Sequence, residues 1–108
     1  MKLEYKFIGW CHDEEENHDK VWGVIYLEAR AESHLWGGPR RKCLTFWGRR
    51  GKKLQTKIVY ENYELAKLID TKREKKGYES IDKKHLDKVY PEFESDLEKT
   101  AVWATLMQ

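Results

Sequence analysis

Residues 33–60 form a basic stretch that is suited to hold an anionic ligand. They carry eight bases and no acid, whereas residues 1–32 have four bases against eight acids and residues 61–108 have nine against eleven. Aromatic residues are interleaved with these bases, and rings beside cations suit a polyanion whose bases or sugars can stack. A solvated basic surface is the alternative interpretation. The bases are Arg40, Arg41, Lys42, Arg49, Arg50, Lys52, Lys53 and Lys57, and the aromatic residues are Trp36, Phe46, Trp47 and Tyr60.

Trp47 and Arg49 fall on one side of a strand that the pattern predicts over residues 42–49. Side chains of a strand alternate between its two faces, so Leu44 and Phe46 share the other face, which we expect to be the core. A ring beside a guanidinium on an exposed face is a platform for a base or sugar next to a phosphate. The alternative is that Trp47 is a packed sheet residue, because tryptophan is often mostly buried.

The turn after this strand adds three more cations. Arg50, Lys52 and Lys53 could bracket a phosphate. If about four bases touch phosphates, the logarithm of the affinity falls with the logarithm of salt with a slope of about −3 to −4. For Gly51 and Gln55, a role in the turn and its register is the simpler interpretation.

Residues 46–56, Phe-Trp-Gly-Arg-Arg-Gly-Lys-Lys-Leu-Gln-Thr, resemble the signature of the WGR domain, which is named for its Trp-Gly-Arg. The family pattern continues with any residue, Gly, three residues and Gln. Leu54 stands where the family often has Gly. The segments 19–22 (Asp-Lys-Val-Trp) and 75–78 (Lys-Lys-Gly-Tyr) resemble the family's opening strand and the end of its helix, so the resemblance covers about residues 17–81. The matching signature residues are Trp47, Gly48, Arg49, Gly51 and Gln55.

This resemblance implies an antiparallel sheet with one helix across it. WGR domains occur in poly(ADP-ribose) polymerases, in bacterial regulators and alone. In the polymerases the domain binds DNA near a strand break: its Trp packs against a terminal nucleotide, and neighbouring bases hold the backbone. The family's Arg also contacts other domains; these 108 residues show no catalytic domain, so we do not expect that second role for Arg49. Only Trp47, Gly48 and Arg49 inherit a role by position.

The sequence pattern predicts strands in the first part of the chain and mainly helices in the second. Strands are expected over 3–10, 20–30, 42–49 and 55–61, with an acidic loop over 11–19 and a short strand within 78–81. Gly23, inside the second strand, indicates a bulge or a close backbone approach.

Three helices follow the strands in the expected order. Asn62 is a good N-cap for a helix over 63–76, and Gly77 suits its left-handed C-terminal position. Asp82 caps a second helix through Val89, and Tyr90-Pro91 ends it. Residues 95–98 (Ser-Asp-Leu-Glu) resemble a capping box for a last helix over 96–106.

These elements predict an α+β fold. It has an antiparallel sheet of four or more strands with one helix packed across it, plus a C-terminal helical extension. We expect residues 1–81 to form the WGR-like unit and residues 82–108 to pack on the same domain. A length of 108 residues allows one modest core.

Other kinds of site lack their signatures. Cys11, His12, His18 and Cys43 are not spaced as zinc ligands usually are, and no nucleotide-binding loop or nucleophile motif is present. We therefore expect no enzyme, no metal and no cofactor. Two cysteines are too few for a disulfide framework, and no secretory signal or membrane span is visible. The expectation is an intracellular protein, cytoplasmic or, in a eukaryote, nuclear.

Two functions remain open from the sequence. The first is a nucleic-acid-binding module, for double-stranded DNA and its ends or breaks before RNA. The second is an interaction module that binds an acidic protein partner or self-associates as a homodimer. For the first, the candidate binding residues are Trp47, Gly48, Arg49, Arg50, Lys52, Lys53, Arg40, Arg41 and Lys42.

Overall fold

A five-stranded antiparallel sheet organises the chain, with the strands in the order β4-β3-β2-β1-β5. The computed structural model describes residues 3–13, 18–27, 41–100 and 103. The fold class is confirmed, with three helices beside the sheet. Along the chain the elements are β1 (Tyr5–Asp13), β2 (His18–Tyr26), β3 (Lys42–Arg49), β4 (Gln55–Tyr60), α1 (Tyr63–Glu74), β5 (Glu79–Ser80), α2 (Lys83–Val89) and α3 (Phe93–Glu98).

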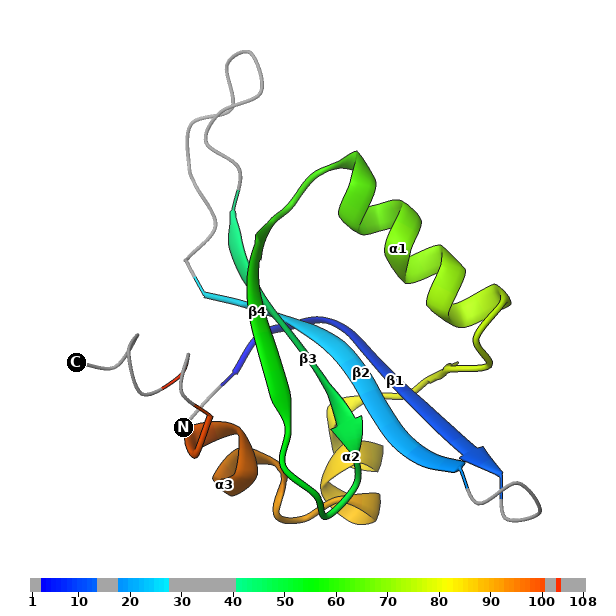
Figure 1. The fold of residues 1–108 in the computed structure, drawn as a ribbon, viewed down its shortest axis with the longest axis vertical. Coiled ribbons are helices and arrows are strands. Elements are labelled where there is room, and N and C mark those ends of the chain that lie inside the picture. Colours follow the sequence, from blue (N-terminus) through cyan, green and yellow to red (C-terminus); the bar gives the residue numbers. More distant parts are fainter. Residues whose placement is uncertain (1–2, 14–17, 28–40, 101–102, 104–108) are drawn as a thin grey trace.

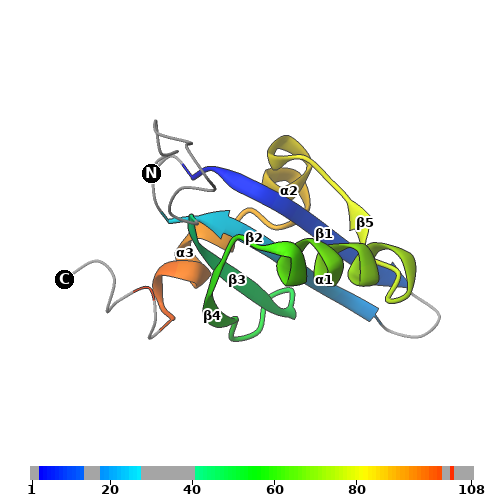
Figure 2. The same ribbon diagram turned by 90° about the horizontal axis from the view of Figure 1, so that it is seen from above.

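The helices lie on opposite sides of the sheet (Figure 1). α1 lies on one side, which we call the α1 face, and α2 and α3 lie on the other, the α2–α3 face. Figure 2 shows α1 over β1 and β2, with β3 and β4 beside it rather than beneath it. Both faces of the sheet are therefore covered, but the α1 face only in part.

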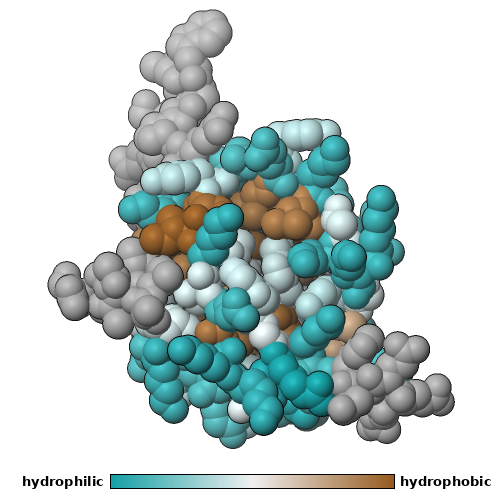
Figure 3. Space-filling model, viewed as in Figure 1, coloured by the Kyte–Doolittle hydropathy of each residue, from teal (hydrophilic) through white to brown (hydrophobic). Residues whose placement is uncertain are grey.

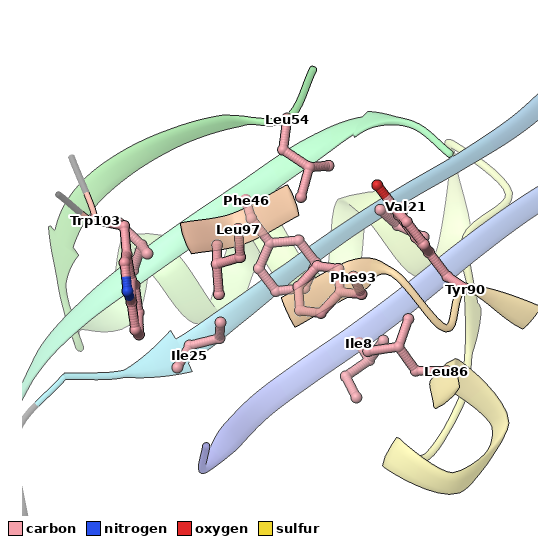
Figure 4. Close-up of a cluster of buried hydrophobic side chains, with 11 residues drawn as sticks. Ile8, Val21, Ile25, Phe46, Leu54, Leu86, Tyr90, Phe93, Leu97 and Trp103 are labelled. Atoms are coloured by element: carbon pink, nitrogen blue, oxygen red, sulfur yellow. The ribbon is translucent and has the colours of Figure 1, made fainter. Parts of the chain in front are cut away.

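The larger core lies between the sheet and the helices α2 and α3 (Figure 4). Phe46 and Phe93 meet at its centre, with ring centroids 4.7 Å apart. Tyr90 and Leu97 flank them, and both side chains are buried. The C-terminal helices thus supply much of the main core.

A second core lies under α1. Leu65 anchors the helix there, and Phe7, Trp22 and Cys43 are buried with it. Gly23 lies opposite Phe46 on the other face of the sheet, where a Cβ would collide with the Phe46 ring and lie 2.6 Å from the carbonyl oxygen of Phe7. The close backbone approach expected at Gly23 is confirmed.

The local helix signals that the sequence carries are largely confirmed. The side-chain oxygen of Asn62 accepts a hydrogen bond from the Leu65 amide at 2.8 Å, and that of Asp82 accepts one from the His85 amide at 2.7 Å. Gly77 has a positive φ of 74°. α1 ends at Glu74, two residues earlier than expected.

The expected last helix is wrong in its start. α3 begins at Phe93, not at residue 96, and Glu92 at its N-cap makes no side-chain capping bond. Ser95 lies inside the helix rather than at its cap. Burial of Phe93 against the sheet outweighs the local capping preference. Residues 101, 102 and 104–106 of the expected helix lie outside the described residues.

The first two strands also differ from expectation. β1 continues through Asp13 and β2 begins at His18, so the expected acidic loop over 11–19 is shorter. Pairing explains this, because Cys11 and His12 lie opposite Lys20 and Asp19 in the hairpin. A ladder of backbone hydrogen bonds thus extends a strand into polar sequence.

Candidate nucleic-acid interface

The sheet register arranges the side chains of the α1 face in rows across the strands. Residues directly opposite each other in an antiparallel pair point to the same face. The first row contains Cys11, Lys20 and Arg49; the second contains Gly9, Trp22, Trp47 and Gln55; the third contains Phe7, Val24, Thr45 and Lys57.

α1 covers these rows over β1 and β2 and leaves the β3 and β4 ends open. Trp22 is only 4% exposed, whereas Trp47, its neighbour in the same row, is half-buried. Arg49, Gln55 and Lys57 are exposed around Trp47. The face opposite Leu44 and Phe46 is therefore open only in part, because α1 and its core extend over its Cys43 end.

Two lysines stand over aromatic rings beside Trp47. The Lys72 ammonium of α1 lies 5.6 Å from the ring centroid of Trp22 and 6.0 Å from that of Tyr78. The Lys20 ammonium lies 5.9 Å from the Tyr78 ring. Cations at these distances are attracted to the ring faces, which holds both of them near the second row.

We call this surface the Trp47 platform. It joins one half-buried ring to four cations and one amide, drawn from β2, β3, β4 and α1. Among the described residues of its rows there is no acid, and Asp13 lies one row beyond Cys11 on the same face. Its members are Trp47, Lys20, Arg49, Gln55, Lys57 and Lys72.

Gly48 shapes the platform from below. Its φ of 152° lies in a region that side chains rarely adopt. A Cβ there would lie 3.3 Å from a methyl group of Leu54 and 3.4 Å from the carbonyl oxygen of Lys53. The glycine of the Trp-Gly-Arg motif therefore lets the end of β3 fold closely onto the start of β4.

Arg50 forms its hydrogen bonds on the α2–α3 face, away from the Trp47 platform. Its guanidinium donates to the Asp19 carboxylate at 2.7 Å and to the carbonyl of Val89 in α2. Its backbone amide donates to the Asp19 carbonyl at 2.9 Å. Arg50 thus fixes the β3–β4 turn against α2.

Lys52 and Lys53 are exposed in that turn. They line a groove of about 330 Å³ together with Asp96 and Lys99 of the α3 region. These two lysines are therefore at the same end of β3 as the Trp47 platform, but they line a groove on the α2–α3 side of the sheet.

Arg41 and Lys42 lie at the other end of β3. Seven residues separate Lys42 from Arg49, which is about 23 Å of strand. The Arg41 guanidinium carbon lies 3.6 Å from the Tyr26 ring centroid, and its Nη2 lies 3.2 Å from the Glu4 carboxylate. Arg40 lies outside the described residues. The nine sequence-predicted residues thus do not form one surface.

The Arg41 end contains a charged network that ties four strands together. Lys6 donates to the Glu61 carboxylate at 2.8 Å, and the Tyr26 hydroxyl donates to it at 2.9 Å. The hydrogen bond from Lys6 lowers the pKa of Glu61. Burial and the hydrogen bond to Glu61 raise the pKa of Tyr26. This network has a structural role and competes with any role of Arg41 as a ligand-binding residue.

Searches against protein-family models, curated proteins and solved structures found no match to this chain.

Four members of the Trp47 platform are absent from the nine sequence-predicted binding residues: Lys20, Gln55, Lys57 and Lys72. Lys20 and Lys57 reach it through the sheet register, so a correct strand pairing could have found them. Lys72 lies on the stripe of α1 that faces the sheet, because it follows Leu65 and Ile69 at helical spacing. Gln55, which the Trp-Gly-Arg pattern already marks, lies directly opposite Trp47.

The two thiols do not form a site together. Cys11 and Cys43 are both free and buried, and they lie three rows apart on the α1 face. Within the described ranges, no group of three or more His, Cys, Asp or Glu residues is placed to hold a metal ion. None of the described helices is long and apolar enough to cross a membrane.

Proposed function

We propose that this chain is a non-enzymatic module that binds nucleic acid, double-stranded DNA foremost, on the Trp47 platform. The observation that carries the proposal is one half-buried tryptophan at the border of the part of the sheet that α1 leaves open. Arg49 and Lys57 are exposed in the neighbouring rows. Lys20 and Lys72 stand over the adjacent rings of Tyr78 and Trp22. Such a surface combines stacking with phosphate neutralisation. The proposal places the protein inside the cell, where DNA is present.

Each platform residue has a chemical task in this proposal. The Trp47 ring stacks on a base or sugar, which suits an exposed terminal nucleotide. Arg49 offers a planar fork to a phosphate, while Lys20, Lys57 and Lys72 act as point charges. Gly48 and the anchored Arg50 position the end of β3 rather than touching the ligand.

The resemblance to the WGR domain supports the same surface. Its matching residues Trp47, Gly48, Arg49 and Gln55 lie together at one end of β3 and β4. The antiparallel sheet with a helix across it, which the resemblance implies, is also the observed arrangement. We propose that the unit through residue 81 is WGR-like and that α2 and α3 are an addition to it.

Fluorescence anisotropy with a labelled blunt-ended DNA hairpin tests the proposal. The full chain is titrated at several salt concentrations between about 50 and about 200 mM, and four phosphate contacts give an expected slope of about −3.6. Trp47→Ala should weaken binding by about 1–3 kcal/mol through lost stacking. Arg49→Glu should weaken it and reduce the slope by at least about 1.

Lys84→Glu is the matched control, since Lys84 is an exposed lysine of α2 on the other side of the sheet. It makes the same charge change and should leave binding nearly unchanged. A wild-type chain that does not bind at low salt, or a control variant that loses as much affinity as Arg49→Glu, contradicts the proposal. An RNA hairpin of the same sequence decides which nucleic acid is preferred.

A further inference from the structure

β4 is an edge strand with apolar side chains on both of its faces. It is the terminal strand of the sheet, so no described strand pairs with its outer side. Ile58 and Tyr60 are 37% and 51% exposed on one face. Figure 3 shows hydrophobic side chains gathered on both sides of the C-terminal half of β4 and beside the start of α1. An exposed apolar edge of this kind is a template for another strand.

The pairing with β3 determines which backbone groups of β4 point outward. The Glu61 amide donates to the Arg41 carbonyl at 2.9 Å, and hydrogen-bonded pairs alternate along an antiparallel ladder. Gln55, Lys57 and Val59 therefore direct their backbone groups to β3. The N–H and C=O groups of the intervening residues, Thr56, Ile58 and Tyr60, point away from the sheet.

A groove runs between β4 and the first turns of α1. Its volume is about 540 Å³. The lining is apolar except for Asn62 and Glu64, and Leu68 within it is 40% exposed. We call it the β4–α1 groove, and its residues are Val59, Tyr60, Asn62, Glu64, Leu65 and Leu68.

We propose that β4 pairs antiparallel with β4 of a second copy of this chain, about a two-fold axis at Ile58. In this register Ile58 faces Ile58 of the second copy and Thr56 faces Tyr60. Each of these pairs exchanges two N–H···O=C hydrogen bonds through the groups that point outward. Their apolar side chains meet on the α2–α3 face, which covers the exposed areas of Ile58 and Tyr60.

Neighbouring registers are less favourable. In an antiparallel pair, the numbers of any two facing residues have the same sum. The outward groups of the two strands face one another again only when this sum changes by two. One such change places Lys57 opposite the Lys57 of the second copy, and like charges directly opposite are destabilising. The other places Lys57 opposite Glu61, whose carboxylate already accepts hydrogen bonds from Lys6 and Tyr26.

Charge complementarity supports the register centred on Ile58. It places Lys57 opposite Val59 of the second copy, and both side chains are on the α1 face. Val59 lines the β4–α1 groove together with Glu64. The Lys57 ammonium of each copy can therefore reach the Glu64 carboxylate of the other. β4 thus supplies the apolar contact and the lysine of the ion pair, and the first turn of α1 supplies the glutamate.

The expected dimer is weak and reversible. An edge-to-edge contact of five β4 residues per chain, from Thr56 to Tyr60, falls in the class of small, transient interfaces, for which we expect a dissociation constant of about 10–100 μM. Because the two-fold axis of such a pair is perpendicular to the sheet, the α1 faces of both copies lie on the same side of one continuous sheet.

Sedimentation equilibrium of the full chain without nucleic acid tests the proposal. The concentration is varied from about 10 μM to about 1 mM at low salt. The wild type should dimerise. Ile58→Pro should raise the dissociation constant at least about tenfold, because it removes a donor that points outward and leaves the β3 ladder intact. Circular dichroism and a thermal melt verify that this variant folds.

A charge exchange tests the register independently of that variant. Lys57→Glu and Glu64→Lys should each weaken the dimer by about 2- to 5-fold, because each places like charges together. The double variant should recover most of the loss, and Lys84→Glu should match the wild type.

Three results would overturn the proposal. They are a wild-type chain that stays monomeric at the highest concentration, a folded Ile58→Pro variant that dimerises as well as the wild type, and a double variant with no recovery. If the edge of β4 instead binds a strand of another protein, the wild-type chain stays monomeric, which is the first of these results. The test involves no DNA, so it can fail while the proposed function holds.

Discussion

Replacing Gly48 by alanine separates the shape of the Trp47 platform from its charge. Gly48→Ala changes no charged group and lies between Trp47 and Arg49. Its φ of 152° belongs to the region that is nearly reserved for glycine, where another residue costs about 1–3 kcal/mol. The new methyl group would also lie 3.3 Å from Leu54, which is only 2% exposed.

The comparison with Gly51 gives this prediction its magnitude. Gly51 has a φ of 83°, and a Cβ there would meet no heavy atom within 4 Å. Gly51→Ala therefore carries the backbone cost alone, about 1 kcal/mol. Gly48→Ala adds the contact with Leu54 and the Lys53 carbonyl, and we expect a total of about 2–3 kcal/mol.

Urea denaturation followed by circular dichroism measures both variants. With a slope of about 1–3 kcal/mol per molar urea, the midpoint of Gly48→Ala should fall by about 1–2 M and that of Gly51→Ala by less. Under conditions where both are folded, Gly48→Ala should also weaken DNA binding more. A Gly48→Ala variant as stable as the wild type, or more stable than Gly51→Ala, would refute the reasoning.

Three further changes have defined outcomes. Removing the Arg50 side chain with Arg50→Met should destabilise the fold by about 1 kcal/mol, because its ion pair with Asp19 is only half-buried; equal urea midpoints would contradict the anchoring role. Phe93→Ala should cost about 3–5 kcal/mol, since the ring is 2% exposed in the main core; a loss below about 1 kcal/mol would mean that α3 is peripheral. Burial raises the pKa of Tyr5 and Tyr90 above the ordinary value near 10, with further contributions from nearby carboxylates. The folded state then holds these protons longer than the unfolded state, so stability is full below about pH 10 and falls as the pH rises beyond it; an alkaline loss of stability that is equally steep in a double variant with Tyr5→Phe and Tyr90→Phe would contradict this.

The sequence predicted the bounds of those elements whose ends depend only on nearby residues. The bounds of β3 and α2 agree with expectation, because turn, capping or helix-breaking residues lie directly beside each element. The Asp82 cap and the Tyr90-Pro91 break act within a few residues of the helix that they delimit. Such signals need no knowledge of the rest of the fold.

The start of α3 could not be found in this way. Ser95 and Glu98 resemble a capping box, yet Phe93 determines where the helix lies. Its ring packs 4.7 Å from Phe46 and 5.7 Å from Tyr90, centroid to centroid. The first of these contacts spans nearly half of the chain, and the periodicity of a single segment carries no information about it.

The site shows the same division. The alternation of β3 predicts that Trp47 and Arg49 share a face, and the register agrees. Which cations join them depends on strand pairing and helix placement. Arg50 and Lys72 illustrate this, since one turns away to Asp19 and the other arrives from α1 to stand over Trp22.

The placement of the helices explains why the open surface lies over β3 and β4. The main core requires α2 and α3 on one face, and α1 is one helix of 12 residues on the other. A helix about 10 Å wide covers about two strands spaced 4.8 Å apart. α1 lies over β1 and β2, where Lys72 stands over Trp22, so β3 and β4 are covered by their own side chains or by a ligand. Long polar side chains around a half-buried ring meet that requirement in solution and leave the ring available to a stacking partner.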